Sequence, residues 1–311
     1  MKLFPLRLIP DNTKIDFMGK RWVAFYLTIL LVICSFGLFF SKSLNYGIDF
    51  TGGILIEVRI KEAPDLAKMR HMLTSLNVGE ISLQTIGTDE DILIRVGGAR
   101  DQKNDQLKNV ELIKNTINQN IASGAEYRKI DFVGPQVGKE LIQNGIYATL
   151  FSFLAIMLYI WMRFEWQYGV GLLIALVHDT IVSIGLMSLL HLEFNLTSIA
   201  ALLTIIGYSV NDSVVIYDRI RENMRKYKKI TISDLINISI NETLSRTILT
   251  VSTTLLATLS LILFGGEAVR SFSIVVFSGI IIGTYSSIYI SAPILIYLGL
   301  KNEQKKIDVK A

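Results

Sequence analysis

The sequence predicts an α-helical membrane protein with six transmembrane helices and one extramembrane α+β domain. Hydrophobic residues make up 51% of the 311 residues, and the mean hydropathy is +0.45. The apolar residues gather in six long runs, each close to the roughly 20 residues that a helix needs to cross a bilayer. Residues 41–140 contain no such run, so they form one large domain outside the membrane.

The six runs set the expected boundaries of the membrane-spanning helices. They cover residues 22–40, 145–162, 168–190, 195–217, 244–264 and 272–298. The last five make up a membrane domain over 145–299. A cleavable signal peptide is an alternative for the first run, but its leader is long and "SKSLNYG" follows it where a small-residue cleavage site would be needed. We therefore expect the first run to be a permanent span.

Basic residues predict the orientation of these spans. They gather in the leader (1–21), in the loop at 218–243 and in the tail (300–311), whereas the opposite short loops hold almost none apart from Arg270. By the positive-inside rule both termini and the 218–243 loop are cytoplasmic, and the 41–140 domain is periplasmic. The net charge of +4 then reflects topology, and we expect no binding to nucleic acid.

The extramembrane domain shows the ferredoxin-like order β-α-β-β-α-β. Ile54, Ile56, Val58 and Ile60 alternate with polar residues, as in a half-buried strand. The expected elements are a strand at 54–60, a helix at 63–76, two strands at 80–86 and 91–96 joined by the turn "GTDE", a helix at 104–123 and a strand at 126–133.

No catalytic or metal-binding constellation is visible in the sequence. His71 lies among charged residues without a nearby Cys or His, so it is expected to be a surface histidine. Cys34 is the only cysteine, which excludes an intrachain disulfide, and it is expected to be a packing residue. No Gly-rich loop ends in Lys-Ser or Lys-Thr. We expect a protein that is not an enzyme and binds neither cofactor nor metal, with a domain used for docking.

Two glycine-containing stretches join this domain to the membrane. "GIDFTGG" (47–53) precedes the first strand and "VGPQVGKEL" (133–141) follows the last one. Hinges and simple turns at a membrane surface are both compatible with such residues. The positions concerned are Gly47, Asp49, Gly52, Gly53, Gly134, Pro135 and Gly138.

Polar residues inside the fourth and fifth runs point to a function. An ionisable residue in a spanning helix costs about 3 kcal/mol on insertion scales, so Asp212, preceded by Asn211, is a candidate site. Arg246, near the cytoplasmic end of the fifth run, is the available partner. A carboxylate that alternates between an arginine and a proton can carry protons. The alternatives are a static ion pair, or an arginine that reaches to the membrane interface.

Further polar residues have two interpretations each. His178 and Asp179 are adjacent and are expected to project in different directions, for interhelical hydrogen bonding or for proton transfer. Threonines at helical spacing in the fifth run favour helix contacts or bonds to their own backbone over a relay; they are Thr243, Thr247, Thr250, Thr254 and Thr258. Small residues every four positions in the sixth run predict close helix packing; they are Gly279, Gly283, Ser287 and Ser291.

Taken together, these motifs resemble one family, the SecF subunits of the bacterial protein-translocation accessory complex, in the resistance-nodulation-division superfamily. The stretches that carry the resemblance are "GIDFTGG", "VGPQVGKEL", "RFEW", "GYSVNDSVVIYDRIREN", "NETLSRT" and "FGGEAVRSFS".

The resemblance implies a role in protein export. Such a subunit pairs with SecD and uses the proton motive force to help pull polypeptides across the inner membrane, after SecA and the SecYEG channel have started the transfer. A YajC-type accessory subunit is a further implied partner. Asp212 and Arg246 match the family's proton-conducting residues; we add Asn211 as a candidate, with His178, Asp179 and Thr250 as secondary ones.

Two other functions remain open at this level. A half-transporter that exports a small molecule or lipid with protons should expose a roomy aromatic pocket, and "YRKIDF" and the helices offer little of that. A passive scaffold would hold Asp212 and Arg246 as a static pair.

Overall fold

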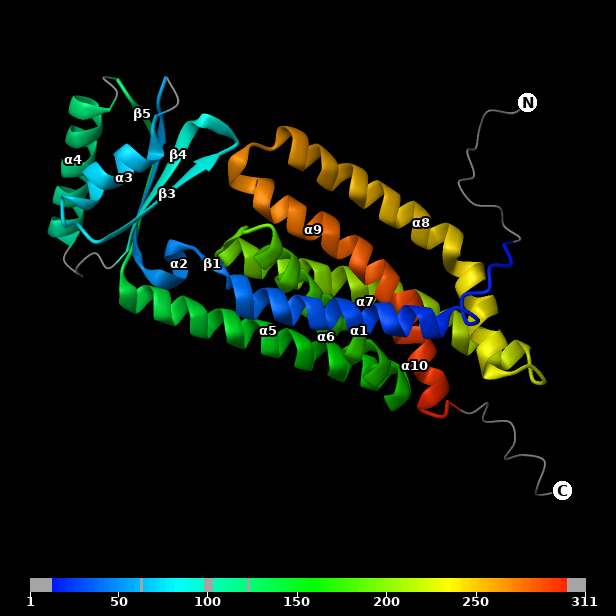
Figure 1. The fold of residues 1–311 in the computed structure, drawn as a ribbon. Helices are drawn as coiled ribbons and strands as arrows, with labels where there is room; N and C mark the ends of the chain where they lie inside the picture. Colours follow the sequence, from blue (N-terminus) through cyan, green and yellow to red (C-terminus); the bar gives the residue numbers. More distant parts are fainter. Residues whose placement is uncertain (1–12, 62–63, 98–102, 122–123, 301–311) are drawn as a thin grey trace, which may run out of the picture. The chain divides into compact units, whose positions relative to one another are not determined.

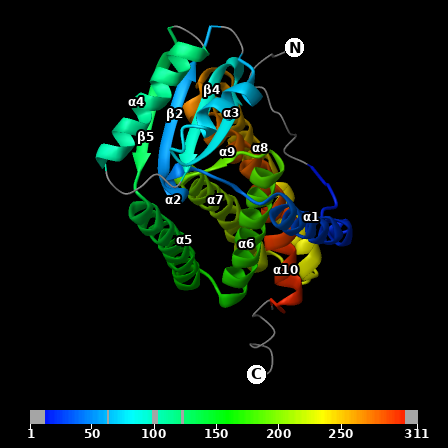
Figure 2. The same cartoon turned by 60° about the vertical axis from the view of Figure 1, so that its left-hand side comes forward.

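A computed structural model describes residues 13–61, 64–97, 103–121 and 124–300 (Figure 1 and Figure 2). The chain divides into two compact units. One holds Met1–Leu44, Thr149–Leu192 and Ser198–Ala311, and the other holds Asn45–Ala148 and Glu193–Thr197. The first is helical and the second contains the sheet, so the expected combination of helical membrane part and α+β domain is confirmed.

The second unit has the ferredoxin-like fold that the sequence predicts. Its elements are β2 (Gly53–Arg59), α3 (Leu66–Thr74), β3 (Glu80–Ile86), β4 (Thr88–Gly97), α4 (Lys103–Asn120) and β5 (Glu126–Val133). The strands form an antiparallel sheet in the order β3-β4-β2-β5, and α3 and α4 lie on one side of it (Figure 1). Alternate strand residues such as Ile54, Ile56 and Ile94 pack there against Leu73 and Ile113.

The expected turn over "GTDE" is wrong in extent. β4 already begins at Thr88, and Thr88 pairs with Ile86. Gly87 alone makes the turn, with a φ of 68° that favours glycine.

A buried carboxylate joins three strands of this sheet. Asp91 of β4 accepts hydrogen bonds from Arg59 of β2 at 2.7 Å (Nε) and 2.5 Å (Nη2), and from the Thr88 hydroxyl at 3.0 Å. Arg128 Nη1 of β5 lies 3.2 Å from Asp91 Oδ1, which also accepts from Arg59 Nε. The hydrogen bonds from Arg59, with smaller contributions from Thr88 and Arg128, hold the pKa of the Asp91 carboxyl below its usual range, although burial acts the other way.

This lowered pKa predicts that the sheet loses stability in acid. A carboxyl with a lower pKa in the folded state stabilises the fold above its unfolded pKa, and that contribution disappears as the pH falls through the folded value. Asp91→Asn should lower the free energy of unfolding of this domain by about 2 kcal/mol at pH 7. This corresponds to roughly 30-fold faster amide exchange in β2 and β4. The measurement is hydrogen exchange of the purified full chain between pH 7 and pH 3.

The matched control is Asp131→Asn, because Asp131 pairs with Lys129 at 2.6 Å on an exposed part of β5. An exposed pair contributes little, so exchange should hardly change. Acid sensitivity that is as large in Asp91→Asn as in the wild type would contradict the assignment to Asp91.

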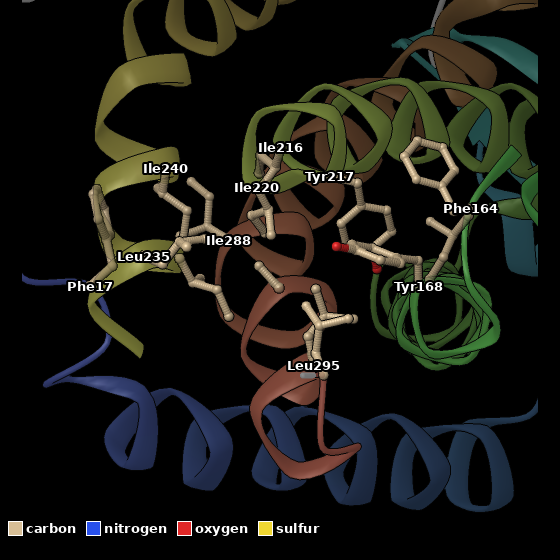
Figure 3. Close-up of a cluster of buried hydrophobic side chains, with 14 of the residues drawn as sticks. Phe17, Phe164, Tyr168, Ile216, Tyr217, Ile220, Leu235, Ile240, Ile288 and Leu295 are labelled. Carbon is tan, nitrogen blue, oxygen red and sulfur yellow. The ribbon is translucent and has the colours of Figure 1, made fainter. Parts of the chain in front are cut away.

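Within the residues that the structure describes, six helical stretches are long and apolar enough to cross a membrane. They are formed by α1 (Arg21–Lys42), α5 (Pro135–Arg163), α6 (Trp166–Leu189), α7 (Leu196–Lys226), α8 (Ile232–Phe264), and α9 (Glu267–Ser286) with its continuation. Apolar side chains of α5, α6, α7, α8 and the stretch 288–295 pack around Tyr168, Tyr217 and Ile288 (Figure 3). The rings of Tyr168 and Tyr217 meet edge to face, with centroids 4.9 Å apart.

The expected loop at 218–243 is mostly helical, because α7 continues to Lys226 and α8 begins at Ile232. The two extensions are tied together by side chains that the hydropathy pattern ignores. Asn223 donates to the Ser239 hydroxyl at 3.0 Å and to Glu242 at 2.6 Å. Thr231 caps α8 by accepting from the Asp234 amide at 3.1 Å.

The sixth span is not the uninterrupted helix that the sequence predicts. After α9 comes a π-helical turn, η1 (Ser287–Ser291), and then α10 (Ala292–Tyr297). Pro293 explains the interruption, because proline lacks the amide hydrogen and its ring collides with the carbonyl four residues earlier in a regular helix. The close packing expected from small residues is confirmed at Gly283, where an added Cβ would lie 3.2 Å from the Ser209 Cβ of α7.

Candidate functional site

Asp212 lies buried between three helical elements, with 5% of its surface exposed. From α8, the Thr247 hydroxyl donates to its Oδ1 at 2.8 Å. From the first residue of η1, the Ser287 hydroxyl donates to its Oδ2. Hydroxyl groups both donate and accept, so this setting can hold the carboxylate in its charged form and also accept a hydrogen bond from its protonated form. The arrangement can therefore take up and release a proton inside an apolar bundle.

Arg246 does not form an ion pair with Asp212. Among the described residues, the nitrogens of Arg246 are not within salt-bridge distance of that carboxylate, and the arginine is exposed. Thr243 and Thr247 lie on the buried face of α8, and position 246 lies about 100° away from 247 around the helix. Arg246 is nevertheless near enough to act on Asp212 through space.

Two of the predicted site residues are exposed on the surface of the helical unit. Asn211 on α7 and Arg246 on α8 both present polar groups outward, while Thr250 is half-buried and donates to the Arg246 carbonyl at 3.1 Å. Polar side chains of this kind in a spanning helix normally face protein or water. Asn211 and Arg246 are therefore expected to have protein or water against them.

His178 and Asp179 are both buried, 4% and 0% exposed, and they contact each other. The expectation that their side chains project in different directions is wrong, because His178 Nδ1 lies 3.0 Å from Asp179 Oδ1. Of the two alternatives left open by the sequence, interhelical hydrogen bonding is present in the structure. Asp179 Oδ2 accepts from Ser209 of α7 and from Ser286 of α9, each at 2.7 Å.

The threonines of α8 mostly bond to their own helix, as expected. Thr243, Thr250, Thr254 and Thr258 each donate to a carbonyl three or four residues earlier. Thr247 is the exception, because its hydroxyl donates to Asp212. The sequence pattern assigns Thr247 and Ser287 only to helix contacts, and Ser209 and Ser286 are not among the predicted site residues. Ser209 could have been found from its position one helical turn before Asp212.

The remaining candidates do not add a chemical centre. Within the described part of the chain, no three His, Cys, Asp or Glu residues come together as metal ligands. His71 is exposed, as predicted. Cys34, expected to be a packing residue, is exposed on α1, and its neighbour Ser35 takes the buried position beside Gly185.

The two glycine-containing junctions contact each other. Gly47 caps α2 (Ile48–Thr51), and Pro135 begins α5, where its missing amide hydrogen has no consequence. An added Cβ at Gly138 would lie 3.0 Å from the Phe50 carbonyl oxygen, whereas at Gly134 it would meet nothing within 4 Å. Gly52 and Gly53 have positive φ values of 70° and 130°.

The same junction also holds the start of α7. Asp49 accepts a hydrogen bond from the Leu196 amide, the first residue of α7, at 2.9 Å. β1 (Asn45–Tyr46) pairs with β6 (Glu193–Phe194), and Arg95 of the sheet binds Glu193 at 2.8 Å. The helix that carries Asp212 thus begins on the sheet-containing unit.

Comparison with known proteins gives matches along nearly the whole chain. Residues 113–301 match the family "Protein export membrane protein SecD/SecF, C-terminal", and residues 37–64 match the "SecD/SecF GG Motif". Curated relatives named "Protein translocase subunit SecF" from Rickettsia felis and Rickettsia rickettsii are each 59% identical over 307 residues, covering 99% of both chains.

Solved structures show the same similarity. The crystal structure of SecDF, a translocon-associated membrane protein from Thermus thermophilus, superposes with a TM-score of 0.84 at 35% identity over 94% of this chain. SecDF in its Super-membrane-facing form gives a TM-score of 0.69 at 35% identity over 98% of this chain. The chain spans only 40% and 41% of those two SecDF chains.

Proposed function

Because the chain belongs to the SecD/SecF family of protein export membrane proteins, as a SecF subunit, we propose that it uses the proton motive force to promote the passage of secreted polypeptides across the inner membrane. It acts together with a SecD-type subunit, after SecA and the SecYEG channel have started the transfer. One observation carries this proposal: Asp212 is buried between hydroxyl donors of two other helical elements, where a change in its protonation alters helix contacts.

In this proposal Asp212 is the residue that takes up and releases the proton. Arg246 and Asn211 act from the exposed side of α7 and α8, and Thr250 bonds to the backbone of Arg246. When the carboxylate is charged, Thr247 and Ser287 hold it. When it is protonated these bonds weaken, so α8 and η1 are released to shift relative to α7.

The energy available from the proton gradient suits this scale of change. One charge that crosses 100 mV releases about 2.3 kcal/mol, and moving a two-state equilibrium from 1:99 to 99:1 requires about 5.5 kcal/mol. One to a few protons per cycle are therefore enough to bias a domain movement.

A SecD-type partner is supported by two observations. The chain corresponds to 40% of the SecDF chain from Thermus thermophilus, so the greater part of that chain has no counterpart here. The exposed polar residues Asn211 and Arg246 also need protein or water against them. The SecYEG channel, SecA, a YajC-type subunit and the translocating precursor complete the set of partners that we propose.

We also propose that both termini are cytoplasmic and that the α+β domain is periplasmic. The basic residues of the α7–α8 connection, among them Arg225, Lys226 and Lys228, support this orientation. The chain acts as a transport subunit, not as an enzyme.

The test uses inverted inner-membrane vesicles that contain SecYEG and the SecD-type subunit, with or without this chain. Import of a secreted precursor is started with SecA and ATP, stopped midway by removing both, and then followed after a proton gradient is imposed. We expect completion to need both the chain and the gradient. Completion that is equal without the chain, or equal with a protonophore, would refute the proposal.

A further inference from the structure

A second buried carboxylate lies close to Asp212 and does not itself contact the Asp212 side chain. Asp179 on α6 is fully buried and has three polar neighbours, His178, Ser209 and Ser286. A carboxylate with this many donors in an apolar bundle is held firmly in one place. The question is whether it is only structural.

Two short bridges join Asp179 to Asp212. In the first, the adjacent residues Ser286 and Ser287 donate one hydroxyl to each carboxylate, Ser286 to Asp179 at 2.7 Å and Ser287 to Asp212. In the second, Ser209 donates to Asp179 at 2.7 Å and lies three residues before Asp212, one turn along α7. The two carboxylates and their serines therefore lie in one polar cluster, in which Ser286 and Ser287 are linked through the backbone and Ser209 and Asp212 through one turn of α7.

Each serine of the first bridge also has a second acceptor. The Ser286 hydroxyl lies 3.0 Å from the Gly283 carbonyl, and the Ser287 hydroxyl lies 2.9 Å from the Thr284 carbonyl. A hydroxyl has a single hydrogen, so it can serve either the carboxylate or its own helix. Protonation of a carboxylate therefore allows the serine beside it to turn back to the helix.

The backbone at this bridge is irregular. Ser287 is the first residue of η1, and π-helical turns are frequent at functional sites. The other end of η1 is held by Tyr217, whose hydroxyl lies 2.5 Å from the Ser291 hydroxyl. A movement of Ser287 is thus confined to this one turn, which begins directly after Ser286.

Three buried polar atoms belong to residues that are next to one of the two carboxylates or one helical turn away from it. His178 Nε2, Ser183 Oγ and Ser213 Oγ are buried and have no hydrogen-bond partner within the described chain. Buried polar groups without a protein partner usually bind ordered water. Such water would provide a path for protons around the two carboxylates.

We propose that Asp179, supported by His178, is a second proton-holding group that is coupled to Asp212 through Ser286 and Ser287. The inference rests on the proposed function, in which Asp212 carries the proton. Three other titratable or charged groups lie near this polar cluster. The aromatic ring of Tyr285 is 6.4 Å from the imidazole of His178, and Tyr208 and Arg246 are near Asp212. Coupled groups titrate as a pair, so loading one changes the loading of the other.

Infrared spectroscopy of the assembled complex in lipid tests the coupling directly. The carboxyl band of Asp212 is identified by its loss in Asp212→Asn, and its titration is followed with pH. In Asp179→Asn and in Ser286→Ala we expect the midpoint to move by about one pH unit, the size at which two sites behave as a pair. Ser286→Ala alone decides the matter if Asp179→Asn does not assemble.

The matched control is Ser278→Ala, also on α9, because the Ser278 hydroxyl bonds only to its own helix, at 2.8 and 3.0 Å. It should leave the Asp212 midpoint unchanged. An Asp212 midpoint that is the same in the wild type, Asp179→Asn and Ser286→Ala would overturn the inference.

Export measurements separate this inference from the proposed function. We expect gradient-dependent export to fall about 10-fold in Asp179→Asn and to show a changed pH profile, because a midpoint shift of about one pH unit changes the ratio of protonated to charged Asp212 about 10-fold. If Asp212→Asn stops gradient-dependent export while Asp179→Asn exports normally, the inference fails and the proposed function stands. If Asp212→Asn exports normally, the proposed function itself fails.

Discussion

Replacing Asp212 with asparagine is expected to reduce export to the level seen with a protonophore, while the complex still assembles. Asparagine has nearly the same shape, so its side-chain oxygen can still accept from Thr247 and its amide can bond to Ser287. It cannot exchange a proton at any physiological pH. The packing of α7 against α8 and η1 should therefore survive, and only the response to the gradient should disappear.

The measurement is precursor import into inverted vesicles with and without a protonophore, alongside co-purification with the SecD-type subunit. The matched control is Asp218→Asn on the same helix, where Asp218 and Arg163 form a half-exposed pair at 3.1 Å. This control should keep gradient-dependent import. Normal stimulation by the gradient in an assembled Asp212→Asn complex would rule out the proton-carrying role.

How far this site could be predicted depends on the kind of information each residue carries. Asp212 stands out from sequence alone, because a carboxylate in an apolar run is costly wherever its helix faces. Its partners are different, because they depend on the rotation of neighbouring helices. A change of one position on α8 separates the buried Thr247 from the exposed Arg246, and the hydropathy pattern of a spanning helix is too uniform to distinguish them.

Ser286 and Ser287 show a second limit of the same kind. In a regular helix, residues repeating every four positions share a face, which suggested only a packing role for Ser287. The regular α-helix ends at Ser286 and the π-helical turn begins at Ser287, whereas a periodicity argument assumes that no such turn occurs. Contacts at this turn therefore required the structure.

The α+β domain was more predictable. The bounds of β3 and β5 agree with the expected ranges, because one side of each strand faces the helices and the other does not. The start of β4 was missed because polar residues before Asp91 were interpreted as a turn. Asp91 can be buried because Arg59 and Arg128 pair with its carboxylate. Amino-acid composition does not reveal such a pairing.

The second large effect is expected at Gly53, the first residue of β2. Its φ of 130° is strained for any residue with a side chain, and an added Cβ would overlap the Val96 carbonyl of β4. That oxygen belongs to the backbone of β4, a central strand of the sheet, so it cannot move aside as a side chain would. Gly53→Ala should therefore destabilise the α+β domain by about 3 kcal/mol.

Limited proteolysis and hydrogen exchange of the full chain measure this loss, and Gly97→Ala provides the comparison within the same sheet. At Gly97 the nearest atoms to an added Cβ are 3.8 Å away, on Glu80, so a change within about 0.5 kcal/mol is expected. The two substitutions add the same methyl group at neighbouring strands and differ in backbone conformation and space. Equal protection of β2 and β4 in both variants would show that the positive φ at Gly53 is not required, whereas selective loss in Gly53→Ala would locate the requirement for glycine in the backbone at the entry to the sheet.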